Sequence, residues 1–244
     1  MKRYCKDVDI LDFEFLQFCA AECLRKKWKR RDVLEYFSGL TGRSKEEILY
    51  AIKNGEKPGL VIVAAHHKFL LVTFRTKDEG GEVPLTHKEY LDFINTVIDA
   101  DCADLIDIEF FTAGDDICEL IDNAHSSGVV VVCSSHDFQK TPDKNELVSR
   151  MVKMQQVGAD LPKVAVMPHD STDVLVLLSA TVEMRNKYFA TPIITISMGK
   201  LGVASRLCGE VFGSAMTFAS AGDSSAPGQV RLDIVNAVLD SITE

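Results

Sequence analysis

From residue 69 onward, short apolar runs alternate with longer segments of helical periodicity, and this alternation constrains the fold more than any other feature. The segments between the runs carry apolar residues at i, i+3 and i+4, as amphipathic helices do. Strands that alternate with helices predict βα units and hence a parallel sheet. The apolar runs are Phe69–Arg75, Leu105–Phe111, Val129–Ser135, Lys163–Met167, Pro192–Met198 and Ala215–Ala219. The helical segments are Tyr90–Ile98, Asp116–Ala124, Asn145–Gln156, Asp173–Tyr188 and Leu232–Ile242.

Six such units, with room for two more in 244 residues, favour an eight-fold (β/α) barrel over an open doubly wound sheet. No glycine-rich dinucleotide fingerprint follows any of the runs, which argues against a nucleotide-binding open sheet. We therefore predict the α/β class and a (β/α)8 barrel formed as one domain by residues 1–244.

The first 66 residues fit this pattern less well, and we expect an atypical N-terminal quarter. Its strand-like runs are Val8–Phe15 and Leu60–Ala65, and its helical segments are Phe18–Leu40 and Ser44–Asn54. Only three residues separate Leu60–Ala65 from Phe69–Arg75, whereas a parallel crossover needs a dozen or more. These two runs therefore predict either a hairpin or one long strand.

Composition excludes several classes of protein. The net charge of −9 argues against binding a polyanion over the whole surface, and no apolar run approaches the ~18 residues of a membrane span. The N-terminal residues lack the apolar region of a signal peptide. The seven cysteines contain no C-x-x-C pair and are typical of reduced thiols. We expect a cytoplasmic protein with neither a nucleic-acid nor a membrane partner.

One candidate for catalysis is His136 in Ser134-Ser135-His136-Asp137, which follows four consecutive valines. These valines predict a buried strand, so His136 would emerge at the strand's carboxyl end, where barrel enzymes carry their catalytic groups. The alternative is a histidine that caps a turn with help from Asp137, and position alone does not separate the two.

A second candidate is Lys163, which stands in an otherwise apolar run between Pro162 and Pro168. A buried lysine has a lowered pKa and is able to form a Schiff base with a ketone. Because Lys163 is at the beginning of its run, position alone favours an exposed strand entry with the amine in water.

Two arginines and a loop could complete an anion site. Arg75 ends one run before Gly80-Gly81, and Arg206 follows a glycine-containing loop. A buried arginine offers a bidentate fork for a carboxylate, although a surface position is the commoner one. Residues 224–229 are a small-residue loop that is either a lid or merely a turn. Together, an amine, a histidine, arginines and a lid suit proton abstraction beside a carbonyl.

Several segments resemble the type I 3-dehydroquinate dehydratases: LVTFRTKDEGGE, SSHDFQKTP, LPKVAVMP, ITISMGKLGVASRLCGEVFGSAMTF and SAPGQ. The resemblance covers about residues 69–244. It implies a (β/α)8 barrel, usually a homodimer, that is a lyase of the shikimate pathway of aromatic amino-acid biosynthesis. The implied reaction converts 3-dehydroquinate to 3-dehydroshikimate and water, with no metal or organic cofactor because a lysine is the electron sink.

The same resemblance assigns roles to individual residues. Lys163 matches the Schiff-base lysine, His136 the general acid/base, and Glu79 the carboxylate that hydrogen-bonds this histidine. The groups that bind the substrate or order the lid are matched by Arg75, Arg206, Ser225 and Gln229, with Arg206 holding the substrate carboxylate.

The N-terminal quarter departs from the family, because residues 1–66 do not reproduce its E-x-R pair on the second strand. Asp12 is the nearest replacement for the acid, but Glu14 stands where the arginine belongs. An inactive or degenerate barrel with a binding role is therefore one alternative. A class I aldolase-type lyase that shares the Schiff-base lysine is another.

Two further motifs have structural interpretations. The basic run Arg25–Arg31 with Trp28 could bind phosphates, but a solvated helix face in an acidic chain is its more ordinary interpretation. His66 and His67 are adjacent, and neighbouring residues of a strand point to opposite faces, so they predict no metal site.

Overall fold

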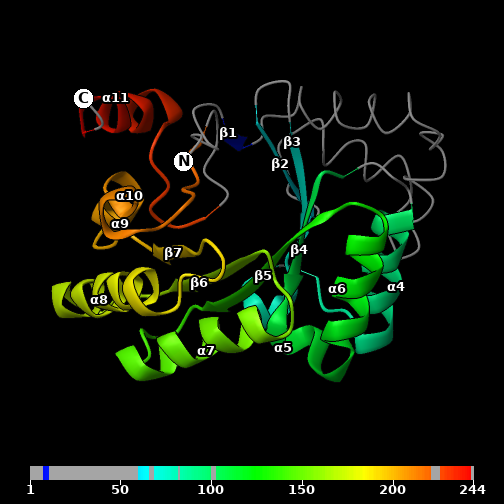
Figure 1. The fold of residues 1–244 in the computed structure, drawn as a ribbon. Coiled ribbons are helices and arrows are strands. Elements are labelled where there is room, and N and C mark those ends of the chain that lie inside the picture. Colours follow the sequence, from blue (N-terminus) through cyan, green and yellow to red (C-terminus); the bar gives the residue numbers. More distant parts are fainter. Residues whose placement is uncertain are drawn as a thin grey trace.

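The computed structural model describes residues 8–10, 60–65, 69–81, 83–99, 103–220 and 226–242. In these residues a seven-stranded sheet has the order β1-β2-β3-β4-β5-β6-β7 (Figure 1). The strands are β1 Val8–Ile10, β2 Leu60–Ala65, β3 Phe69–Phe74, β4 Leu105–Glu109, β5 Val130–Asp137, β6 Leu161–Val166 and β7 Ile194–Ser197. The helices are η1 Lys77–Glu79, α4 His87–Asp99, α5 Phe110–Ala113, η2 Gly114–Asp116, α6 Ile117–Ser126, α7 Lys144–Gln156, α8 Ser171–Lys187, α9 Val203–Leu207, α10 Gly209–Phe212 and α11 Leu232–Ile242.

The strands from β3 to β7 are all parallel, which confirms the predicted βα units. Several strand boundaries differ from the prediction by one or two residues, and two of these differences concern the site. Strand β6 begins at Leu161 rather than Lys163, and β4 ends at Glu109 because α5 begins at Phe110. The earlier start of β6 has a consequence for the site, since it moves Lys163 from the strand entry into the strand.

The run Leu60–Ala65 forms a hairpin with β3, which decides between the two predicted alternatives. The pairing is antiparallel, from Leu60 opposite Phe74 to Ala65 opposite Phe69. Strand β1 adds to β2 in the same antiparallel sense. The predicted helices of residues 18–40 and 44–54, and residues 11–15 of the predicted first strand, lie outside the described residues.

The last predicted strand, Ala215–Ala219, is wrong as a strand. The chain makes an isolated parallel bridge between Ile193 and Ser214, and Ala215 N–H donates to Ile193 O at 2.7 Å, but no ladder follows. The Ser214 hydroxyl accepts the Thr195 N–H at 3.0 Å, where a ladder would present a carbonyl. A side chain that takes a backbone donor in this way competes with regular pairing.

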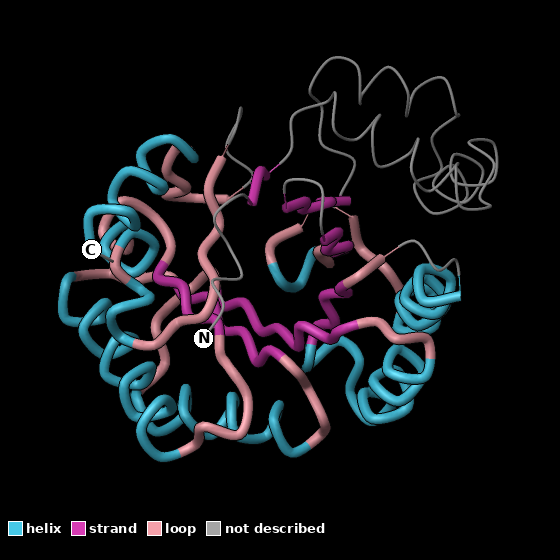
Figure 2. The backbone as a smooth tube through the Cα atoms, turned by 45° about the horizontal axis from the view of Figure 1, so that its top comes forward, coloured by secondary structure: helices cyan, strands magenta, loops and turns pink. Residues whose placement is uncertain are grey.

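The α-helices lie along the outer side of the curved row of strands (Figure 2). One apolar cluster joins alternate strand residues such as Ile106, Val131 and Val164 to the buried faces of α4, α6, α7 and α8. A second cluster, including Leu71, Val132, Ala165 and Ile194, lines the inner face. Two apolar faces on a parallel sheet are what strands enclosed on both sides require.

The inner face becomes polar toward the carboxyl ends of the strands. Because side chains alternate along a strand, every second residue of β3 to β6 shares this face. The inner series are Leu71, Thr73 and Arg75 at β3, Leu105, Asp107 and Glu109 on β4, Val132, Ser134 and His136 on β5, and Leu161, Lys163 and Ala165 on β6. Polar and charged side chains of four neighbouring strands therefore meet above an apolar floor. No described helix has the length and apolarity of a membrane span.

Candidate active site

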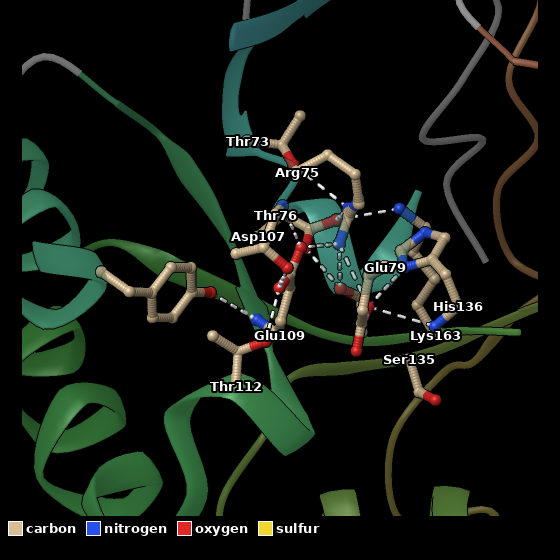
Figure 3. Close-up of polar contacts among 12 residues, drawn as sticks. Thr73, Arg75, Thr76, Glu79, Asp107, Glu109, Thr112, Ser135, His136 and Lys163 are labelled. Atoms are coloured by element: carbon tan, nitrogen blue, oxygen red, sulfur yellow. Dashed lines mark hydrogen bonds and ion pairs between the residues drawn. The ribbon is translucent and has the colours of Figure 1, made fainter. Parts of the chain in front are cut away.

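Lys163 lies on the inner face of β6 and is 6% exposed. Its neighbours across the sheet are Ser134 of β5 and Ile194 of β7. Its Nζ donates to Asp107 Oδ2 at 2.8 Å, and the Asp107 side chain is fully buried. The exposed strand entry that position alone favoured is therefore wrong, and the amine belongs to a buried polar network (Figure 3).

Asp107 on β4 is the centre of this network. Its Oδ2 accepts hydrogen bonds from both Lys163 and Arg75, the latter at 3.0 Å. Its Oδ1 accepts from the Ser134 hydroxyl at 2.5 Å, and that hydroxyl in turn accepts from Arg75 at 3.1 Å. Both carboxylate oxygens are thus occupied, which fixes the carboxylate relative to the lysine.

Arg75 holds the carboxylates together. Its NH1 donates to Glu109 at 2.9 Å and to Glu79 at 3.4 Å, and its NH2 donates to Thr73 at 3.2 Å in addition to Asp107. Five donors in a planar fork allow one guanidinium to serve this many acceptors. Arg75 therefore organises the acidic groups of the site.

Glu109 supports Arg75 from the end of β4. Its carboxylate accepts from Thr76 N–H at 2.9 Å, from the Thr76 hydroxyl at 2.6 Å and from the Thr112 hydroxyl at 2.7 Å. Its own N–H donates to the hydroxyl of Tyr90, which is fully buried in α4. A carboxylate held this completely acts as a structural anchor for the guanidinium.

His136 is oriented by Glu79. Its Nδ1 lies 2.8 Å from Glu79 Oε2, and its backbone N–H donates to the same oxygen at 3.1 Å. Glu79 ends the short helix η1, after which Gly80 takes the left-handed conformation with φ of 90°. A Cβ on Gly81 would lie 1.8 Å from the Arg75 carbonyl oxygen. The pair of glycines is thus what lets this turn carry Glu79 over the site.

Burial determines the protonation of this cluster. It raises the pKa of Glu79 to about 8, and the Glu109 carboxylate adds to the rise. Burial, with help from Arg75 and Lys163, lowers the pKa of His136 well below 6.5. Near neutral pH Glu79 therefore keeps its proton, and the imidazole of His136 is uncharged.

The pKa values of Lys163 and of its partner Asp107 are both lowered. Burial lowers the pKa of Lys163 from 10.5, although Asp107 opposes this shift. Burial alone would raise the pKa of Asp107, but Arg75 and Lys163 outweigh it and hold the pKa below the ordinary value. An ionised carboxylate next to an amine that deprotonates more easily is a fitting arrangement for a nucleophilic lysine.

Arg206 lies on α9 and is 2% exposed. Its NH1 donates to Phe218 O at 3.4 Å and its NH2 to Pro227 O at 3.1 Å, while Nε has no partner among the described residues. Burial lowers its pKa to about 10. A buried guanidinium that donates only to neutral carbonyls keeps its charge unpaired and can donate to an anion.

The remaining expected site residues are placed only in part. Gln229 lies just beyond Pro227, and its N–H donates to Ala226 O at 3.3 Å. Ser225 and Asp12 lie outside the described residues, as do His66 and His67. Where side chains are described, no group of three histidines, cysteines or acids is arranged to hold a metal ion.

Sequence reasoning missed Asp107 and Glu109, although both lie in the run predicted as a strand. The available signal was their spacing, since two acids at i and i+2 share one face of a strand whose other residues are apolar. Arg75 directly follows the neighbouring strand β3, so the pairing of β3 and β4 brings opposite charges together.

Comparison with known proteins identifies relatives of this chain. The sequence model of type I 3-dehydroquinase matches residues 57–244. A 3-dehydroquinate dehydratase of Salmonella typhimurium is 48% identical over 184 residues, which are 75% of this chain and 73% of the relative. The identity and coverage of a 3-dehydroquinate dehydratase from Salmonella agona are the same.

Solved structures give the same result. The type I 3-dehydroquinate dehydratase of Clostridium difficile, crystallised with covalent modified comenic acid, is 40% identical with a TM-score of 0.73. The match covers 94% of this chain and 88% of that one. The 3-dehydroquinate dehydratase of Geobacillus kaustophilus is 34% identical with a TM-score of 0.71, covering 95% and 87% of the two chains. The fold is therefore that of a (β/α)8 barrel, in which the described strands β1 and β2 pair in the antiparallel sense.

Proposed function

We propose, because this chain belongs to the type I 3-dehydroquinase family, that it dehydrates 3-dehydroquinate through a Schiff base on Lys163. The chain is a hydro-lyase of the shikimate pathway, and the covalent mechanism is the part proposed here. The observation that carries it is the buried amine of Lys163, held by Asp107 at 2.8 Å among the inner polar groups of β3 to β5.

The first step is attack of the neutral Lys163 amine on the ketone carbon of the substrate. The carbonyl oxygen leaves as water with the two protons of the amine, and one further proton from solvent gives the protonated imine on Nζ. Burial favours the step because it lowers the pKa of Lys163 and so increases the neutral amine. Asp107 keeps the nitrogen in place by its hydrogen bond.

The second step is proton abstraction from the carbon next to the imine. Neutral His136 takes the proton, and the electron pair of the C–H bond moves to the imine nitrogen to form an enamine. Because Oε2 of Glu79 accepts the backbone N–H of His136, it also accepts Nδ1–H, which leaves Nε2 as the basic atom. The cationic nitrogen of Lys163 serves as the electron sink, so these residues complete the step without another cofactor.

The third step expels the hydroxyl group at C1. The enamine electrons return toward the ring and break the C–O bond, and His136 gives its proton to the leaving oxygen, which departs as water. A further water then hydrolyses the conjugated imine, which releases 3-dehydroshikimate and restores the amine. His136 thus acts as base and then as acid in one turnover.

Arg206 is the proposed partner of the substrate carboxylate. Its guanidinium is buried, lacks an acidic partner among the described residues and is bound to the loop of residues 224–229 through Pro227 O. An anion that pairs with it would satisfy the free Nε. Arg75 and Gln229, together with Ser225 and Asp12, complete the proposed substrate contacts.

Borohydride reduction of the protein mixed with 3-dehydroquinate tests the covalent step. We expect a stable substrate adduct on Lys163, located by peptide mass spectrometry, and its loss together with turnover in Lys163→Ala. The matched control is Lys153→Ala, which removes an exposed lysine of α7 and should change neither. Near-normal turnover by Lys163→Ala would refute the mechanism.

We also propose that the chain forms one domain and assembles as a homodimer. Pairing of β1 and β2 with β3 in one sheet supports the single domain. Sedimentation equilibrium should give twice the 27.0 kDa chain mass, and a single cooperative unfolding transition is expected.

A further inference from the structure

The aromatic face of Phe218 lies next to the amine of Lys163. The distance from Nζ to the ring centroid is 4.8 Å, and Lys163 is 6% and Phe218 7% exposed. A cation within about 6 Å of a ring centroid is attracted to the negative face of the ring, most strongly where water is excluded. The contact therefore has the distance and the burial of an effective cation–π interaction.

Phe218 also contacts the second cationic group of the site. Its carbonyl oxygen accepts from Arg206 NH1 at 3.4 Å. The residue belongs to the segment 215–219, which lies beyond α10 and carries no regular ladder. One residue thus touches the amine with its ring and binds the anion-accepting arginine with its backbone.

The other groups around Nζ leave one side of the amine free for the ring of Phe218. Asp107 of β4 accepts its hydrogen bond, and Arg75 and Glu79 act on it electrostatically from the end of β3 and from η1. His136 faces it from β5. An ammonium has three N–H donors, and the described residues offer one hydrogen-bond acceptor, Asp107. The ring of Phe218 covers a part of the ammonium group that makes no hydrogen bond to the described residues.

We propose that the ring of Phe218 stabilises the positive charge on Lys163 Nζ, first as the ammonium and then as the iminium of the substrate adduct. The second state rests on the proposed function. When the imine forms, the nitrogen becomes planar and keeps one N–H in place of three. Attraction to a ring face does not depend on N–H direction, so it persists through this change while hydrogen bonding decreases. Phe218 is thus a positioning residue that acts through Nζ.

The proposal predicts a direction for the titration of the free protein. A ring face that favours the protonated amine raises the pKa of Lys163, so weakening the face lowers that pKa. Pentafluorophenylalanine at position 218 keeps the shape of the ring and reverses its quadrupole. At a fixed pH below the pKa, the fraction of neutral amine should rise about 2- to 30-fold.

The measurement is the pH dependence of Lys163 acetylation by acetic anhydride, quantified by peptide mass spectrometry without substrate. Fluorination of position 218 should shift the titration to lower pH, and a monofluorinated ring, which disturbs packing least, should shift it less. Phe218→Tyr keeps the ring face and should leave the titration in place. The control is pentafluorophenylalanine at Phe138, another side chain packed on the inner cluster.

The outcomes separate this proposal from the proposed function. An unchanged titration in both fluorinated variants of position 218 would overturn it, as would an equal shift from position 138. A shift at position 218 alone would support it, even if wild-type protein gave no borohydride adduct with 3-dehydroquinate. That last result would refute the Schiff base and leave the ring contact standing.

Discussion

Lys163 and Arg75 donate to the same oxygen of Asp107, at 2.8 Å and 3.0 Å. Two cations on one fully buried carboxylate oxygen keep Asp107 ionised, and their attraction outweighs the effect of burial on its pKa. The arrangement holds two like charges close together, and the carboxylate between them offsets their repulsion. Asp107 is therefore the residue on which the placement of the reactive amine depends.

Asp107→Asn should lower turnover about 10- to 100-fold, because a hydrogen bond to a charged group contributes about 1.5–3 kcal/mol. The amide keeps the size of the side chain and lets the pKa of Lys163 fall further, so a loss of turnover reports the lost placement of the amine and not its protonation. The rate of borohydride trapping at Lys163 should fall with turnover. Turnover and the rate of trapping are both measured at one constant pH in native protein.

The matched control is Asp122→Asn, which removes an exposed carboxylate of α6. It should leave trapping and turnover unchanged. If Asp107→Asn trapped the substrate as fast as wild type, the amine would not depend on this carboxylate.

His136→Gln should separate the proton transfers from formation of the imine. Glutamine retains hydrogen-bonding capacity toward Glu79 but does not move protons near neutral pH, so we expect turnover to fall about 10²- to 10⁴-fold. The substrate adduct on Lys163 should still be trapped by borohydride. His125→Gln, at an exposed histidine paired with Asp160, is the control. Loss of trapping in His136→Gln alone would contradict this division of roles.

The sequence was most informative where local pattern and environment agree. The runs at Phe69–Arg75 and Leu60–Ala65 became strands, and helix Leu232–Ile242 has the predicted bounds. Each is a short apolar run or an amphipathic segment whose burial follows from periodicity alone. The (β/α)8 fold followed from their alternation.

The remaining features depend on contacts between distant residues. Periodicity gives no sign that the Ser214 hydroxyl takes the Thr195 N–H and prevents a ladder at Ala215–Ala219. The burial of Lys163 likewise depends on where β6 starts and on Asp107 of another strand. The role of Lys163 followed from the resemblance to the family, whereas its burial and its hydrogen bond to Asp107 became known only from the packed structure.

Glu79→Gln should flatten part of the pH dependence of stability. The folded protein raises the pKa of Glu79 from the ordinary 4.5 to about 8, so the folded state keeps a proton that the unfolded chain releases. This contribution is fully present below about pH 4.5 and is lost as pH rises through about 8. Between these values the free energy of unfolding should decrease with pH, by up to about 1.4 kcal/mol per unit for this one group.

Glutamine imitates the protonated acid and removes this titration. Urea unfolding from pH 5 to pH 8 should therefore show a smaller decrease in Glu79→Gln than in wild type. Glu119→Gln, at an exposed position of α6, should keep the wild-type slope. Equal slopes for Glu79→Gln and wild type would place the pKa of Glu79 near its ordinary value.

Arg206→Met should weaken substrate binding while leaving the fold at least as stable. The guanidinium is buried with carbonyl partners and a free Nε, so the folded protein carries an uncompensated desolvation cost that methionine removes. We expect the free energy of unfolding to be unchanged or to rise by about 1 kcal/mol or more. KM should rise about 10- to 100-fold, because the substrate carboxylate loses a charged hydrogen bond. Steady-state kinetics and urea unfolding measure the two effects on one preparation. Arg185→Met, at an exposed arginine of α8 that donates to Val211 O at 3.1 Å, controls for loss of any arginine. A KM that stays at the wild-type value would remove Arg206 from the substrate site, and a large loss of stability would instead make it a structural residue.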